Sequence, residues 1–226
     1  MVAIFVAFMF VSLVLLDLSV EKWKAWRTSL SARDHVSQVA SVPATPWQFP
    51  DGIRISPAHT WLKPESTGSI EVGADALITY AVGAVRRVIL PKAGEQATEG
   101  QPLFRLEHNG SGITVRSSVT GQVTAVNNRL IEEPGLLSSD PYGSGWVCRV
   151  TPTHTKNGGS RMRLGKEAVM WLNDEFSRFR EFILTQLSPD FALGTVSQDG
   201  GLPAVGCLGE LSQETWSAFE EQFLRG

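Results

Sequence analysis

The chain has 226 residues, which is enough for one sizeable core or for two small ones. Its 20 basic and 23 acidic side chains leave a formal net charge of −3, without a long basic run, which argues against nucleic-acid binding. The two cysteines, Cys148 and Cys207, are too far apart for a CxxC metal site, although a single bridge between them stays open. The four histidines lack ligand spacing, so no metal site is expected. No bound cofactor is expected either.

The first twenty residues predict a transmembrane anchor. Residues 1–16 contain no charged side chain, and the apolar character resumes beyond Asp17. A helix of about 20 residues reaches roughly 30 Å, the thickness of the hydrocarbon core of a bilayer. A cleaved signal peptide is the alternative, but the segment has no basic start and no small-residue cleavage site before Glu21. An uncleaved single span over residues 1–20 is therefore favoured.

The residues that follow this span predict its orientation. Lys22, Lys24 and Arg27 come directly after it, whereas nothing basic precedes it except the α-amino group. The positive-inside rule then places the N-terminus outside and the soluble domain in the cytoplasm, as in a single-pass protein of the bacterial inner membrane type. Trp23 and Trp26 suit the aromatic belt at the membrane interface, and the alternative for both indoles is a small soluble core.

Residues 21–57 form a juxtamembrane segment that ends in a proline-rich stretch. Four prolines between positions 43 and 57 exclude a helix there, so an extended tether or a strap lying on a partner is expected. Trp47 and Phe49 favour the strap, because a free linker would leave large apolar side chains in water. Both residues are therefore candidates for partner binding.

The centre of the chain, residues 58–155, is expected to be mainly β with helices, an α+β domain. The run from Leu103 to Gly121 predicts two strands joined by Asn109 and Gly110, a pair that favours a type I′ hairpin turn because both positions tolerate positive φ. The shorter elements predicted here are strands over 68–72, 85–90 and 122–126 and a helix over 74–82.

Several motifs around this hairpin resemble the glycine cleavage system H protein, a shuttle that carries lipoate. The matching pieces are His59-Thr60-Trp61, Leu90 to Gly94 with Gly100, Val119 to Gly121, Val126-Asn127, Pro134 and Asp140 to Trp146. The last of these motifs is quite specific, and the resemblance covers roughly two fifths of the chain. It implies a barrel-sandwich hybrid, a fold of two small facing sheets.

In that family the hairpin tip presents a lysine, three residues after a glutamate, whose amine is acylated by lipoate. The resemblance places the glutamate at Glu107 and leaves Gly110 at the lysine position. Glycine has no amine, and the guanidinium groups of Arg105 and Arg116 stay protonated and non-nucleophilic. Lys92, the nearest lysine in sequence, falls on a different turn. The scaffold is therefore expected without the carrier chemistry, and the hairpin is interpreted as an ordinary surface turn.

Residues 160–226 predict a helical C-terminal extension. Apolar residues at steps of three and four predict a long helix over 166–187, and a shorter helix is predicted near the end of the chain. Trp216, Phe219 and Phe223 share one face of that shorter helix. They either pack on the central domain or form a partner surface, so they join the candidates for partner binding.

The sequence indicates a protein that is not an enzyme, because no nucleophile has an adjacent histidine and acid and no phosphate loop occurs. We expect a membrane-anchored adaptor or assembly subunit of a larger membrane complex, photosynthetic or respiratory. Its partners would be integral membrane subunits and the lipid bilayer, and no nucleic acid. The alternative is a docking or regulatory protein for lipoate-dependent enzymes, or a carrier that binds a small ligand non-covalently.

The predicted orientation can be tested with introduced cysteines. Residues after the span lie in the cytoplasm under this prediction, so a membrane-impermeant thiol reagent should leave Ser66→Cys and Asn157→Cys unlabelled in intact cells. Both should react after lysis, which controls for their accessibility. Efficient labelling of either residue from outside would reverse the predicted topology.

Overall fold

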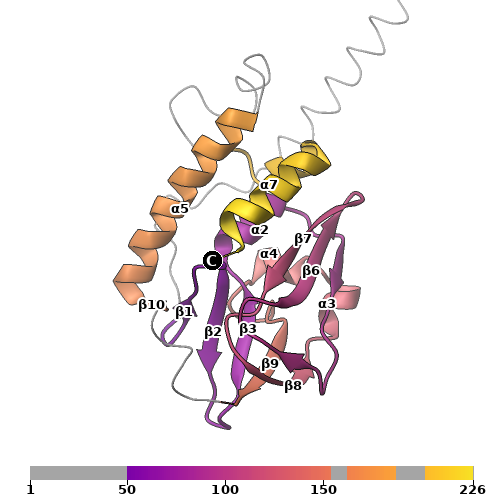
Figure 1. Cartoon of the computed structure of the whole chain (residues 1–226), viewed down its shortest axis with the longest axis vertical. Coiled ribbons are helices and arrows are strands. Elements are labelled where there is room, and N and C mark those ends of the chain that lie inside the picture. Colours follow the sequence, from indigo (N-terminus) through magenta and orange to yellow (C-terminus); the bar gives the residue numbers. More distant parts are fainter. Residues whose placement is uncertain (1–49, 154–161, 187–201, 226) are drawn as a thin grey trace, which may run out of the picture. The chain divides into compact units, whose positions relative to one another are not determined.

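The computed structural model describes residues 50–153, 162–186 and 202–225, all within one compact unit. The strands of the larger of its two sheets are β1 (Arg54–Ile55), β2 (Thr60–Pro64), β3 (Ile70–Ala74), β5 (Gln96–Ala97), β8 (Gly121–Val126), β9 (Cys148–Pro152) and β10 (Arg163–Leu164). The strands of the smaller sheet are β4 (Arg87–Ile89), β6 (Pro102–His108) and β7 (Ser111–Arg116). The helices are α2 (Ala76–Val82), α3 (Arg129–Glu132), α4 (Leu136–Ser139), α5 (Gly165–Gln186), α7 (Gln213–Phe223) and the 3₁₀ turn η1 (Cys207–Glu210) (Figure 1).

The two sheets are antiparallel and have seven and three strands. The strand order is β10-β1-β2-β3-β9-β8-β5 in the larger sheet and β4-β6-β7 in the smaller one. Side chains from both sheets meet in one apolar core, for example Val72 and Val150 from the larger sheet and Leu106 and Val115 from the smaller. The expected α+β fold is confirmed, and the structure adds that both sheets are antiparallel.

The predicted hairpin is confirmed in both its strands and its turn. His108 of β6 pairs with Ser111 of β7, which leaves a turn of two residues between them. Asn109 and Gly110 have φ angles of 48° and 87°, as a type I′ turn requires. From Phe104 to Glu107 on β6 and from Ile113 to Arg116 on β7, buried residues alternate with partly exposed ones, because successive side chains of a strand point to opposite sides.

The resemblance implied two small sheets, but the larger sheet also contains strands from outside the predicted domain. Arg54 and Ile55 of β1 pair with Leu164 and Arg163 of β10, so residues on both sides of the predicted domain, 58–155, add strands to one edge. Ile55 is fully buried there. The sheet therefore begins before residue 58, since the end of the proline-rich stretch supplies a strand.

Helix α2 begins at Ala76, later than the start of the predicted range of 74–82. The carboxylate of Asp75 accepts hydrogen bonds from the backbone N–H groups of Leu77 and Ile78, at 3.0 and 3.2 Å. Asp75 is thus the N-cap, and the helix begins at Ala76, because a capping residue keeps an extended backbone. All seven residues of α2 are buried.

The C-terminal part of the chain crosses α2 at two glycines. Gly83 and Gly206 have φ angles of 69° and 77°, and a Cβ added at Gly83 would lie 2.5 Å from the Cα of Gly206. The N–H of Gly206 donates to the carbonyl of Tyr80 at 2.8 Å. The Tyr80 hydroxyl donates to the carbonyl of Pro203 at 2.6 Å. Only residues without a side chain permit this close crossing.

The predicted long helix is confirmed as α5, and it packs against α7. Its apolar stripe is buried at Ala168, Leu172, Phe176, Phe179 and Ile183. Aromatic rings from the two helices interlock, with centroids 5.6 Å apart for Phe179 and Phe219. No described helix is long and apolar enough to cross a bilayer, and the span predicted over residues 1–20 lies outside the described residues.

The pairing of β2 with β3 generates a stability prediction. Gly73 lies opposite Trp61, and a Cβ at position 73 would lie 2.5 Å from Cε2 of the fully buried indole. Gly73→Ala should therefore lower the free energy of unfolding by about 1–3 kcal/mol, measured by urea denaturation. Gly135→Ala is the control, because Gly135 has helical dihedrals and no heavy atom within 4 Å of an added Cβ. Equal stability of the two variants would contradict the prediction.

Candidate functional site at the β6–β7 hairpin

The tip of the hairpin is exposed and carries no amine. Asn109 and Gly110 are both exposed, and a Cβ added at Gly110 would meet no heavy atom within 4 Å. The turn thus projects into open space, and a side chain placed at position 110 would be accessible to small molecules.

The outer face of the smaller sheet holds a group of paired charges beside the tip. The carboxylate of Glu107 lies 3.3 Å from Nε of Arg105 and 3.5 Å from Nη1 of Arg87. Arg105 also donates from Nη1 to the Thr114 hydroxyl at 3.2 Å. Glu107 therefore shares its charge between two guanidinium groups on a solvated face, where each such pair contributes at most about 1 kcal/mol.

The C-terminal extension contacts both strands of the hairpin. Helix α7 lies beside β7 (Figure 1), and Glu220 accepts a hydrogen bond at 2.9 Å from the backbone N–H of Thr114. On the other strand, a Cβ added at Gly209 of η1 would lie 2.9 Å from Nε2 of His108. The opposite ring nitrogen of His108 bonds to the carbonyl of Ala84. These contacts fix the flanks of the hairpin while the tip stays open.

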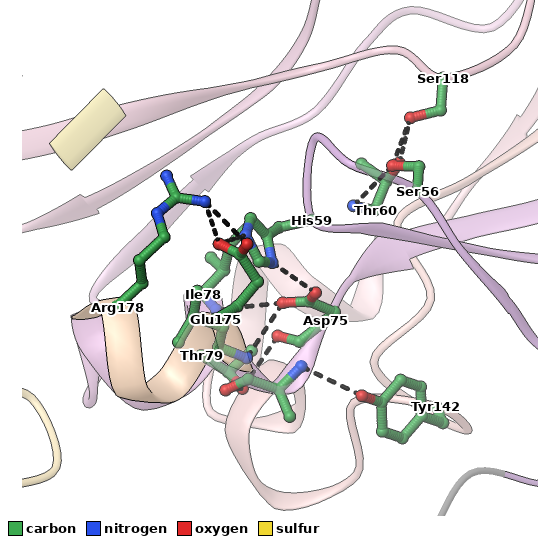
Figure 2. A network of polar contacts seen from close by, with 12 residues as sticks. Ser56, His59, Thr60, Asp75, Ile78, Thr79, Ser118, Tyr142, Glu175 and Arg178 are labelled. Atoms are coloured by element: carbon green, nitrogen blue, oxygen red, sulfur yellow. Dashed lines mark hydrogen bonds and ion pairs between the residues drawn. The ribbon is translucent and has the colours of Figure 1, made fainter. Parts of the chain in front are cut away.

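A second polar cluster is buried between β2, α2 and α5, and Figure 2 shows its members. Nδ1 of His59 lies 2.7 Å from Oδ2 of Asp75, the residue that caps α2. Nε2 of His59 lies 3.5 Å from Oε2 of Glu175, which is an ion-pair distance without hydrogen-bond geometry. Arg178 completes the cluster, with Nη1 at 2.7 Å from both carboxylate oxygens of Glu175.

The charges in this cluster support one another. Burial alone would lower the pKa of His59, but the charge of Asp75 and its hydrogen bond, followed by Glu175, raise the pKa to about 9. Burial alone would raise the pKa of Glu175, but His59 and then Arg178 hold it below its usual value. A histidine that stays protonated at neutral pH is a poor general base. The cluster therefore joins β2, α2 and α5 through buried charges and leaves His59 without a free basic nitrogen at neutral pH.

The ring of His59 also stacks on an aromatic side chain of α5. Its centroid lies 5.0 Å from that of Trp171, with 26° between the planes. The guanidinium of Arg163 lies 4.6 Å from the centroid of the same indole. The indole thus contacts two cationic groups, an arrangement that stabilises both.

Sequence reasoning missed this cluster, although the sequence carries one signal of it. Glu175 falls on the apolar stripe of α5, next to Phe176, and it is 7% exposed. A carboxylate at such a position needs a partner. That the partner is His59, more than 100 residues earlier in the chain, follows only from the tertiary structure.

The structure describes some of the predicted site residues, and the others lie outside the described part of the chain. Gly110 lies at the hairpin tip, as expected. The side chains of Trp216, Phe219 and Phe223 are at most 2% exposed, so the structure favours packing within the chain over a partner surface for all three. The membrane-interface and strap residues lie outside the described residues, namely Lys22, Trp23, Lys24, Trp26, Arg27, Trp47 and Phe49. Among the described residues, no three His, Cys, Asp or Glu side chains are placed so that they could hold one metal ion.

Comparison with known proteins identifies one family. The family model described as glycine cleavage H-protein matches residues 53–174. The mitochondrial glycine cleavage system H protein of Flaveria pringlei is 30% identical over 154 residues, which cover 68% of this chain and 91% of that protein. The corresponding mitochondrial protein of Pisum sativum is 33% identical over 130 residues, covering 57% of this chain and 78% of that protein. The crystal structure of the H protein from Mycobacterium marinum matches with 24% identity and a TM-score of 0.48, covering 56% of this chain and 99% of that chain.

The raised pKa of His59 predicts a pH-dependent stability. Because the pKa is about 9 in the folded chain against 6.5 for a free histidine, this contribution is complete below pH 6.5 and is lost as the pH rises through 9. His59→Asn should remove it, since asparagine tolerates the positive φ at this position, 57°. The difference in unfolding free energy between the native chain and the variant should shrink by about 2 kcal/mol from pH 7 to 9.5.

Urea denaturation of the full chain in detergent at both pH values measures this difference. His108→Asn is the matched control, because His108 makes no ion pair among the described residues. It should leave the pH dependence unchanged. A pH-independent difference for His59→Asn would contradict the assigned ion pairs.

Proposed function

The chain belongs to the glycine cleavage H-protein family, and we propose that it serves as a non-catalytic scaffold that carries no lipoate on its hairpin. The observation that supports this most directly is the tip itself. Asn109 and Gly110 form the exposed turn, and neither has a side-chain amine that could form an amide with a carboxylic acid.

No lysine elsewhere in the hairpin can take over the acceptor role. The chain has no lysine between Lys92 and Lys156. Lys92 lies in the turn that precedes β5, where its backbone N–H bonds to the carboxylate of Glu95 at 2.9 Å. Lys63 lies on β2 of the larger sheet. The arginines beside the tip remain protonated and cannot be acylated.

We further propose that the scaffold is a subunit of a larger membrane complex. Residues 1–20 would anchor it as a single span, and the basic residues after the span would keep the domain in the cytoplasm. The strap residues Trp47 and Phe49 would then bind another subunit, because large apolar side chains are typical of permanent interfaces. The buried ion pairs of His59 support a structural role, since they fix α5 on the domain and leave no free base.

One preparation tests the proposal with two readouts. The chain is extracted from its native membrane in mild detergent and purified by an affinity tag. Its intact mass should equal that of the unmodified polypeptide, because no acceptor amine stands at position 110. The same preparation should contain membrane subunits in stoichiometric amounts, and Trp47→Ala with Phe49→Ala should reduce their recovery by about tenfold.

Ile131→Ala is the matched control for this loss of apolar surface. Ile131 is 65% exposed on α3, within the described domain, so its truncation should leave the recovered subunits unchanged. A lipoyl increment on the native chain would refute the non-carrier role. A chain recovered alone and monomeric would instead favour the docking or ligand-binding alternative.

A further inference from the structure

A C-terminal segment of the same chain lies against both flanks of the hairpin. We propose that residues 202–224 form a built-in cover that blocks the docking of any enzyme directed at the hairpin tip. This inference rests on the proposed function only for the identity of the tip as the family's acceptor position. It concerns access to the tip, whereas the proposed function concerns the missing amine.

The first part of the cover lies along β7. In the described sheet β7 is an outer strand, since the order is β4-β6-β7. An outer strand presents unpaired backbone groups that can bind another chain. Glu220 of α7 accepts the hydrogen bond of Thr114 N–H at 2.9 Å, so a side chain of the extension takes the place of a partner strand at this point.

The second part of the cover lies beside β6, close to the turn. The backbone of η1 at Gly209 contacts the ring of His108, one residue before the turn. Residues 203–206 are held on α2 by the two hydrogen bonds that join Tyr80 with Gly206 and Pro203. Both flanks of the hairpin are therefore covered by the same segment of chain.

Buried aromatic side chains hold this cover in place. Trp216, Phe219 and Phe223 are at most 2% exposed, and burying each such side chain contributes roughly 1.5–3 kcal/mol. Arg178 of α5 adds a hydrogen bond at 2.8 Å to the carbonyl of Gln222 and lies 4.5 Å from the centroid of the Phe223 ring. These contacts fix α7 against α5 and the core, and so keep the cover in its place beside the hairpin.

The cover lies beyond the part of the chain that matches the family model. That match ends at residue 174, whereas every cover residue that touches the hairpin comes after position 200. The scaffold shared with the family and the segment that covers its hairpin are thus separate parts of the sequence. This separation allows the cover to be changed without altering the matched region.

The contact area that an enzyme needs around the tip is large enough to reach the cover. A standard interface buries about 800 Å² on each partner, which corresponds to a disc with a radius of about 16 Å. Thr114 lies four residues after Gly110, about 13 Å along an extended strand. An enzyme centred on the tip would therefore overlap α7 and η1. A small reagent needs no such area, and the tip has open space around it.

The test uses the full chain with Gly110→Lys, which restores an amine at the tip. A lipoate–protein ligase with ATP and lipoate is the large probe, and an N-hydroxysuccinimide ester of acetic acid is the small one. Intact mass and peptide mapping give the rate of modification at position 110. We expect the small reagent to acylate this lysine readily and the ligase to modify it slowly.

Glu220→Arg is added to loosen the cover, because it replaces the acceptor for Thr114 N–H with a cation. Glu221→Arg is the matched control: it makes the same change of charge on the next residue of α7, where Glu221 pairs with Arg225 at 3.1 Å and has no other ion pair within the described part of the chain. If α7 is detached from the hairpin in about a tenth of the molecules, a substitution that detaches it in all of them should raise the ligase rate about tenfold. Glu220→Arg should show this gain and Glu221→Arg should not.

A chain that ends at Leu211 provides a second release variant, which keeps the test decisive if Glu220→Arg fails to fold. The proposal is overturned if Gly110→Lys alone is loaded as fast as the Pisum sativum H protein. It is also overturned if neither release variant gains while the small reagent still reacts. Lipoate on the native chain would refute the proposed function and would leave the comparison of the Glu220 and Glu221 variants intact.

Discussion

The arrangement of the helices depends on one buried charge pair, His59 with Asp75. Asp75 caps α2 through its Oδ1 atom and binds His59 through Oδ2, so a single carboxylate fixes the start of a helix and the charge of an imidazole. The protonated ring then attracts Glu175, which places α5 on the domain. A buried ion is stable only with partners in good geometry. Each member of this cluster therefore requires the others.

The same cluster joins the C-terminal helices to the region that matches the family model. The matched region ends at residue 174, and Glu175 is the next residue. The first residue after the family region thus binds a histidine that belongs to it. Once α5 is fixed in this way, its aromatic face provides the surface on which α7 packs, and α7 in turn reaches β7. The cover on the hairpin is the last step of this series of contacts.

Local sequence signals predicted the elements but not their assembly. Asn109 and Gly110 predicted the hairpin, and the apolar stripe predicted α5, because both signals act over a few residues. Strands β1 and β10 have two residues each, which is too short for any periodicity to show. The position of α7 on β7 depends on a hydrogen bond between residues 106 positions apart, and no local pattern encodes such a contact. The absence of an amine at the tip, in contrast, can be read directly from Gly110 once the hairpin is recognised.

The distance in sequence between β7 and its cover has a consequence for synthesis on the ribosome. β7 ends at residue 116 and α7 begins at residue 213, so 96 residues are translated between them. At about 5–20 residues per second, the edge of β7 is complete for roughly 5–20 s before α7 exists. During that interval the nascent chain exposes a strand edge that could pair with a neighbouring chain on the same polysome. The charge that β7 itself carries against such pairing is the guanidinium of Arg116, its last residue.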